Sequence, residues 1–135
     1  MRTISHHAAL IYVMVVVSAA DGRMSDKELA AIGQITRSLP VFRDFDRDRL
    51  IATASDCAAI LQEEDGLAAV LGLVAEALPE HLRETAYWLA LEVALSDRVA
   101  LEEVRVIETL RRALGIDRLT AAALERGARA RHQIA

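Results

Sequence analysis

The chain has 135 residues with only 2 prolines and 6 glycines, which predicts a single domain over residues 1–135 that is helical throughout. Its net charge of −4 at neutral pH argues against a nucleic-acid partner, because such proteins need a basic face that displaces counterions. The single cysteine, Cys57, excludes an internal disulfide and a thiolate metal cluster, and a buried apolar role is expected for it.

The first predicted helix, at roughly residues 4–20, is almost wholly apolar, which places it at the centre of the fold. Its apolar run, residues 8–20, is shorter than the ~20 residues that span a bilayer. The run also resembles a secretion signal, but a similar run at residues 86–95 lies in mid-chain, where no signal can act. We therefore expect a core helix and a cytoplasmic protein.

The second predicted helix begins after a turn at Gly22, a residue suited to the left-handed backbone that ends a helix. Ser25 and Glu28 have the spacing of a capping box, in which each side chain accepts a backbone N–H of the other residue. The apolar stripes of this helix and of the next include Leu29 and Ile51, which are therefore expected in the core.

Five further helices complete an all-α fold of about seven helices, since no segment alternates with the period of two that marks a strand. They are expected at about residues 48–62, 67–78, 81–95, 101–114 and from Asp117 or Thr120 to 131. Glu92 is expected on a polar face of the fifth helix rather than as a buried acid. His6 and His7 are expected to be exposed, and as neighbours on a helix they cannot easily share one ion.

The chain contains the same unit twice, at residues 8–39 and 84–114. Tyr12 aligns with Trp88 and Asp21 with Asp97, both 76 positions apart. After a gap of one residue in the loop, Glu28 aligns with Glu103, 75 positions apart. Such a repeat can have a purely structural role, in which each copy builds one half of the core. It also predicts that the acids in the two copies are related by a pseudo-two-fold axis.

Four carboxylates in this repeat form a candidate cation site: Asp21, Glu28, Asp97 and Glu103. In each copy the Asp follows one helix and the Glu lies in the first turn of the next. The unsatisfied carbonyl groups at the C-terminal end of the first helix point into the same corner. Oxygen ligands of this kind suit a divalent metal such as Ca²⁺, Mg²⁺ or Mn²⁺, with Zn²⁺ also to be tested, and no organic cofactor is expected.

A purely structural role for these acids is the alternative, in which Glu28 caps its helix and Asp21 accepts backbone N–H groups in a turn. That explanation is weaker at Glu103, because Ala100 stands where the first copy has Ser25.

Four segments of the chain resemble the tellurite-resistance TerB family: AADGRMSDKE, LPVFRDFD, LRETAYWLALEVALSD and EEVRVIETLRRALGI. The resemblance implies a seven-helix fold with an internal duplication, and carboxylates at the four positions above that bind a divalent metal. It also implies a role in bacterial responses to tellurite and other stresses. Other stress-response proteins would be the partners, in an assembly near the membrane but without membrane insertion.

The second acidic motif departs from the family pattern, because Arg98 follows Asp97 where a glycine is usual and the loop is one residue shorter. The Arg98 side chain could neutralise Asp97 and replace a metal.

The sequence contains no recognisable catalytic set, so the leading hypothesis is a non-enzymatic module that binds a divalent cation or a protein partner through the duplicated acids. The first alternative is a metal-dependent hydrolase that uses the same carboxylates. The second is a structural scaffold that forms a homo-oligomer through its apolar faces.

Overall fold

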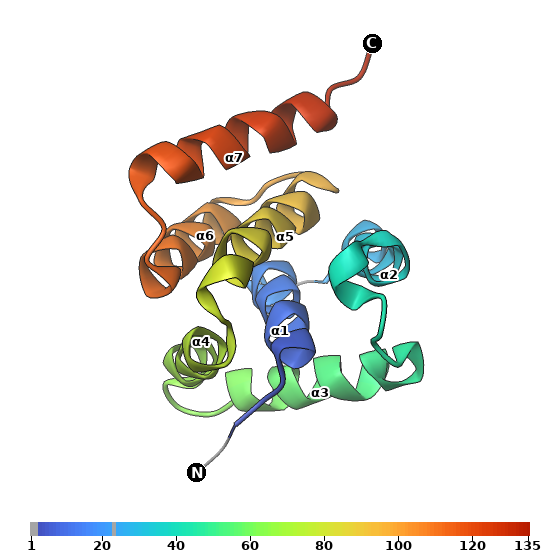
Figure 1. Ribbon diagram of the computed structural model, residues 1–135, viewed down its shortest axis with the longest axis vertical. Coiled ribbons are helices and arrows are strands. Elements are labelled where there is room, and N and C mark those ends of the chain that lie inside the picture. The colour runs from blue at the N-terminus through green and yellow to red at the C-terminus, as the bar shows by residue number, and fades with distance from the viewer. Residues whose placement is uncertain (1–2, 23) are drawn as a thin grey trace.

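A computed structural model describes residues 3–22 and 24–135 (Figure 1). This part of the chain contains helices and no strand, which confirms the all-α prediction. The seven α-helices are α1 (His6–Ala19), α2 (Asp26–Ser38), α3 (Leu50–Leu61), α4 (Gly66–Ala77), α5 (Arg83–Leu95), α6 (Leu101–Leu114) and α7 (Arg118–Arg131). Three short 3₁₀ helices join them: η1 (Pro40–Phe42), η2 (Arg47–Arg49) and η3 (Glu80–Leu82).

Helix α1 forms the centre of the molecule, as its composition predicts. Every residue from Ala9 to Ser18 is buried, because a helix that is apolar on all sides gains stability only when other elements surround it. Helix α1 packs against α5, α3 and α4, and each fully buried large side chain contributes about 1.5–3 kcal/mol. In Figure 1, α3 lies on one side of α1, and α5, α6 and α7 are layered on the other.

The repeat is visible in the helix boundaries. Helices α1 and α5 end at Ala19 and Leu95, 76 positions apart, whereas α2 and α6 begin at Asp26 and Leu101, 75 positions apart. Each unit therefore consists of a largely buried helix followed by an amphipathic one. The two buried helices pack against each other, which brings the two inter-helix corners to the same end of the core.

The predicted ends of the helices are correct to within a few residues. Gly22 and Gly115 both have left-handed backbone, with φ of 80° and 69°. The third and fifth helices begin later than predicted because a 3₁₀ turn, η2 or η3, precedes each of them. Cys57 is buried as expected, and burial raises the pKa of its thiol to about 12. Among the described residues, no helix has the length and apolarity needed to cross a membrane.

Two predicted core residues are exposed. The Leu29 residue is 49% exposed and Ile51 is 80% exposed. An apolar stripe indicates which side of a helix faces the core. It does not indicate how many residues on that side the neighbouring helices cover. The edges of these stripes extend beyond the neighbouring helices.

Two predicted surface residues are instead enclosed. The side chain of His7 is 12% exposed, with Nε2 2.8 Å from the Val41 carbonyl and 3.3 Å from Asp44, and its ring stacks on Phe42. Glu92 is 6% exposed, because the end of α7 covers it and places Arg131 and His132 against its carboxylate. The polar face predicted for α5 at Glu92 is therefore wrong.

Candidate metal centre

All four sequence-predicted acids line one cavity of about 420 Å³, which lies where the two repeat corners meet. Asp21 and Asp97 come from the turns after α1 and α5, whereas Glu28 and Glu103 come from the first turns of α2 and α6. The remaining lining residues are Ser25, Arg98, Val99, Ala100 and Glu102. The duplication therefore brings together residues as far apart in the sequence as Asp21 and Glu103, which are separated by 82 positions.

The two glutamates are fixed by their positions at helix N-termini. The Ser25 N–H donates to Glu28 Oε1 at 3.1 Å, and the Ala100 N–H donates to Glu103 Oε1 at 2.8 Å. Both glutamates are buried, at 5% and 1% exposure. Glu103 thus accepts the N–H of the N-cap residue, as Glu28 does, although that residue is alanine. The bond that is missing is the one from the Glu103 N–H to an N-cap side chain, because Ala100 has no side-chain acceptor. In the first copy, the Glu28 N–H donates to the Ser25 hydroxyl at 3.1 Å.

The second oxygen of Glu103 has no such support. Glu103 Oε2 is buried and has no hydrogen-bond partner among the described residues. Burial, and next the Glu28 carboxyl, which is close enough to accept a hydrogen bond from protonated Glu103, raise the pKa of Glu103 to about 7, and the charge of Asp21 adds to this effect. An unpaired buried carboxylate oxygen beside a second carboxylate is costly unless a proton or a cation occupies the space between them.

Asp97 has the opposite electrostatic environment. The Arg98 backbone N–H, 2.8 Å from Asp97 Oδ1, and then the Ser25 side chain hold the pKa of Asp97 below its ordinary value. Asp97 is therefore ionised at neutral pH. Because Ser25 belongs to the first copy, this stabilisation acts across the repeat.

The guanidinium of Arg98 does not neutralise Asp97. Arg98 lines the cavity, but within residues 3–22 and 24–135 its side chain forms no ion pair within 4.0 Å. Its contact with Asp97 is made by the backbone N–H alone. Arg98 also needs no left-handed backbone, since Asp65 is the one non-glycine residue with positive φ in the described chain. The shorter loop of the second copy thus makes the turn without the conformation adopted by Gly22.

The donor set suits a hard divalent cation. The cavity is lined by carboxylate and hydroxyl oxygens and by no histidine or cysteine, as Ca²⁺, Mg²⁺ or Mn²⁺ prefer. The unpartnered Glu103 Oε2 provides a buried ligand atom. As the side chains stand, no three His, Cys, Asp or Glu residues of the described chain form a group tight enough to hold an ion. A cation held by all four acids would therefore require the more accessible Asp21 and Asp97 to turn toward the glutamates, whose Oε1 atoms accept backbone N–H groups.

Two cavity residues with polar side chains, Ser25 and Glu102, were not predicted as part of a site. Ser25 was identified only as a helix cap, and its effect on Asp97 depends on a contact between the two copies. Glu102 is exposed beside Glu103 at the rim of the cavity. The only sequence signal for it was the pair of adjacent glutamates at the start of the sixth helix.

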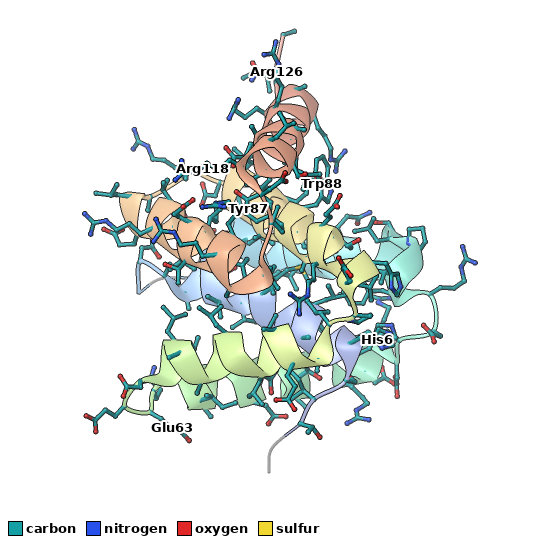
Figure 2. All side chains as sticks on the ribbon, turned by 60° about the vertical axis from the view of Figure 1, so that its left-hand side comes forward. His6, Glu63, Tyr87, Trp88, Arg118 and Arg126 are labelled. Carbon is teal, nitrogen blue, oxygen red and sulfur yellow. The ribbon has the colours of Figure 1, made fainter. Side chains whose placement is uncertain are left out.

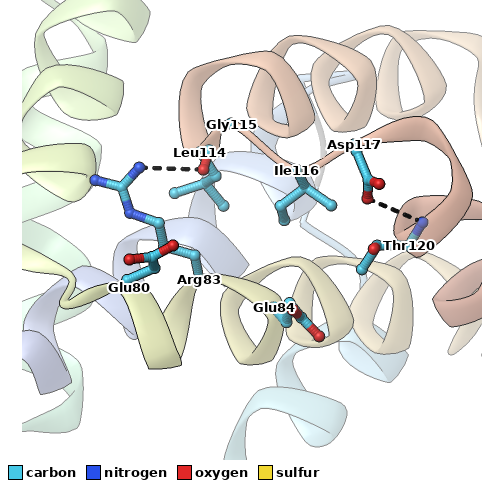
Figure 3. Close-up of a pocket in the computed structure, with 8 residues that line it drawn as sticks. All are labelled: Glu80, Arg83, Glu84, Leu114, Gly115, Ile116, Asp117 and Thr120. Carbon is cyan, nitrogen blue, oxygen red and sulfur yellow. Dashed lines mark hydrogen bonds between the residues drawn. The ribbon is translucent and has the colours of Figure 1, made fainter.

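A second cavity of about 420 Å³ surrounds Arg83, but its polar groups hold helix ends together (Figure 3). The Arg83 guanidinium donates to the carbonyls of Leu114 and Ala75, at 3.1 and 3.0 Å, and so satisfies the ends of α6 and α4. Asp117 accepts the Thr120 N–H at the start of α7. These contacts identify the cavity as a junction between helices.

A model of the family described as "Tellurite resistance protein TerB" matches residues 7–126. The match contains both acidic corners and nearly all of the seven helices. No curated protein and no solved structure matches the chain. The duplicated helical fold and the match over most of the sequence agree, and the chain belongs to the tellurite resistance protein TerB family.

Proposed function

We propose that this protein is a non-enzymatic, divalent-cation-binding module associated with tellurite resistance. Asp21, Glu28, Asp97 and Glu103 would supply the ligand oxygens. The observation that carries the proposal is the buried and unpartnered Glu103 Oε2 beside the Glu28 carboxyl.

The four side chains contribute differently. Glu28 and Glu103 are held in place by backbone N–H groups, so their free oxygens need little reordering before they bind an ion. Asp97 is already ionised and therefore requires no proton loss. A divalent cation would supply the positive charge that relieves the repulsion between these carboxylates.

The cation would also determine what the corner presents to a partner. Turning Asp21 and Asp97 inward changes the charge and shape of the cavity rim, next to the exposed Val99 and Leu101. We propose that the occupied corner docks another stress-response protein, in the cytoplasm and in an assembly close to the membrane.

Calorimetric titration of chelator-stripped protein with Ca²⁺, Mg²⁺, Mn²⁺ and Zn²⁺ tests the cation. Saturable binding is expected for at least one of the first three. Glu103→Gln should weaken it about 100-fold or more, because the amide replaces a charged ligand. The same substitution retains an oxygen for the Ala100 N–H, so the fold should persist.

Glu63→Gln provides the matched control, since Glu63 is an exposed glutamate in the turn between α3 and α4. It should bind as the wild type does. Wild-type protein that shows no saturable heat with any of the four ions would refute the proposal. Equal loss in both variants would show that the effect is one of net charge rather than of the cavity.

A further inference from the structure

Charge is strongly segregated between two parts of the molecule that do not belong to the acidic corners. Residues 50–82, which include α3 and α4, contain six acids and no lysine or arginine. All six are exposed: Asp56, Glu63, Glu64, Asp65, Glu76 and Glu80. Helix α7 instead contains four arginines and one glutamate. One region is therefore acidic and the other basic.

Helices α3 and α7 lie at opposite ends of the molecule, although Glu80 of the acidic region lines the second cavity with Thr120 of α7. In Figure 1, α7 and α3 form the two outer layers, with α1 and α5 between them. Figure 2 shows Arg118 and Arg126 on α7 at one end and Glu63 at the other. The exposed surfaces of α3 and α7 consequently cannot meet within one copy of the chain.

Helix α3 has an outer face that no other part of the described chain covers. Although the helix is apolar in composition, only Cys57 and Ile60 are buried among its 12 residues. Ile51 is 80% exposed. We define the α3 face by the exposed residues Ile51, Ala52, Ser55, Asp56 and Ala59, with Glu63 just beyond the helix.

Helix α7 has a similar uncovered face. Ala121 and Ala128 are buried against the molecule, whereas Leu119 is 80% exposed. We define the α7 face by the exposed residues Leu119, Ala122, Ala123, Arg126 and Ala130, which recur at the spacing of one side of a helix. Among the described residues, Arg118, Arg126 and Arg129 form no ion pair.

We propose that the α7 face of one copy docks on the α3 face of a second copy, in a head-to-tail contact. Each face begins with a large exposed aliphatic residue, Leu119 or Ile51, and continues with alanines around a charged residue, Arg126 or Asp56. The charges are basic on α7 and acidic on α3. A parallel arrangement of the two helices would therefore match Leu119 with Ile51 and Arg126 with Asp56.

The dimensions of the two faces also agree. Leu119 to Ala130 extends over about 16 Å of helix and Ile51 to Glu63 over about 18 Å, at ~1.5 Å per residue. One helix pair gives an interface at the small end of the range, below about 1,200 Å² in total, so the association is weak. Because different surfaces meet, a second docking can follow the first and larger assemblies can grow.

Two double variants, each altered on one face only, test this contact. Leu119→Gln/Arg126→Gln removes the α7 face, and Ile51→Arg/Asp56→Arg removes the α3 face, so that the two altered faces are not complementary to each other. All four positions are exposed, so both variants should melt close to the wild type. Sedimentation at increasing concentration, in about 20 mM and about 500 mM salt, measures association and its screening.

The wild type should self-associate at low salt, and association should weaken about tenfold or more at high salt. Each variant alone should remain monomeric. An equimolar mixture of the two should form dimers and nothing larger, because each variant supplies the face that the other lacks. Arg105→Glu, an exposed reversal on α6, should associate as the wild type does.

A wild type that is monomeric at every concentration in low salt would overturn the proposal. The same result is expected if the α3 face binds a basic helix of another protein and not a second copy. Wild-type association combined with a monomeric mixture would also overturn it, because that result indicates a contact between identical faces.

Discussion

The two acidic corners contain equivalent acids but support them differently. In the first corner Ser25 and Glu28 complete a reciprocal pair of hydrogen bonds. In the second, Glu103 caps Ala100 without a return bond and retains one buried oxygen that has no partner in the described chain. Capping therefore accounts for Glu28 more completely than for Glu103. The comparison indicates that the second corner retains a carboxylate although glutamine could accept the same N–H bond.

The largest expected effect concerns the pH dependence of stability without a bound cation. The ordinary pKa of Glu103 is 4.5, whereas its pKa in the folded protein is about 7. The folded state thus binds this proton more tightly, so the Glu103 contribution to stability declines as pH rises from about 4.5 to about 7 and is constant above that. Glu103→Gln should abolish this decline and raise the Tm at pH 8 by about 5 °C.

Thermal denaturation in chelator between pH 4 and pH 9 measures this difference. Glu102→Gln, which changes the exposed neighbouring residue, should reproduce the wild-type profile. Parallel curves for the wild type and Glu103→Gln would show that the folded protein does not hold a proton at the second corner.

The next largest effect is expected from exchanging the N-cap residues of α2 and α6, Ser25 and Ala100. Ser25→Ala removes the side-chain cap of α2 and a group that stabilises ionised Asp97, and it should cost about 1–2 kcal/mol. Ala100→Ser gives α6 the cap that it lacks and should stabilise the protein by about 0.5–1 kcal/mol. Urea denaturation of both variants measures the two values. A loss of stability with Ala100→Ser would mean that the cavity cannot accommodate a second hydroxyl.

The smallest effect is expected at Arg98, the residue that distinguishes the second turn. Arg98→Gly removes an unpaired positive charge from the cavity rim, so cation affinity should rise about threefold to tenfold at low salt. The gain should diminish at high salt, which calorimetry in two buffers can measure. Arg105→Gly, on the exposed side of α6, controls for net charge. Affinity that falls in Arg98→Gly would instead assign Arg98 a role in holding the turn.

Local features of the fold could be predicted from the sequence. The apolar run of α1 specified a central helix, and Ser25 with Glu28 specified a helix start. The repeat also predicted that four distant acids would lie near one another, because equivalent corners of packed units meet. These features depend on short segments or on the symmetry between them.

Features that depend on long-range covering could not be predicted. Glu92 is buried because residues about 40 positions later cover it, and α5 itself contains no trace of that contact. His7 is enclosed by the segment around Phe42 and Asp44. The unpartnered oxygen of Glu103 arises from the meeting of two copies, and neither copy shows it alone.

The joining of two units in one chain has an evolutionary consequence. Two identical subunits that pair about a true two-fold axis must have the same residue at both corners, whereas a fused pair can change one corner without the other. Here Gly22 corresponds to Arg98 and Ser25 to Ala100. Fusion thus permits the two corners to differ: the first has a complete capping box at its helix start, and the second is free to change without it.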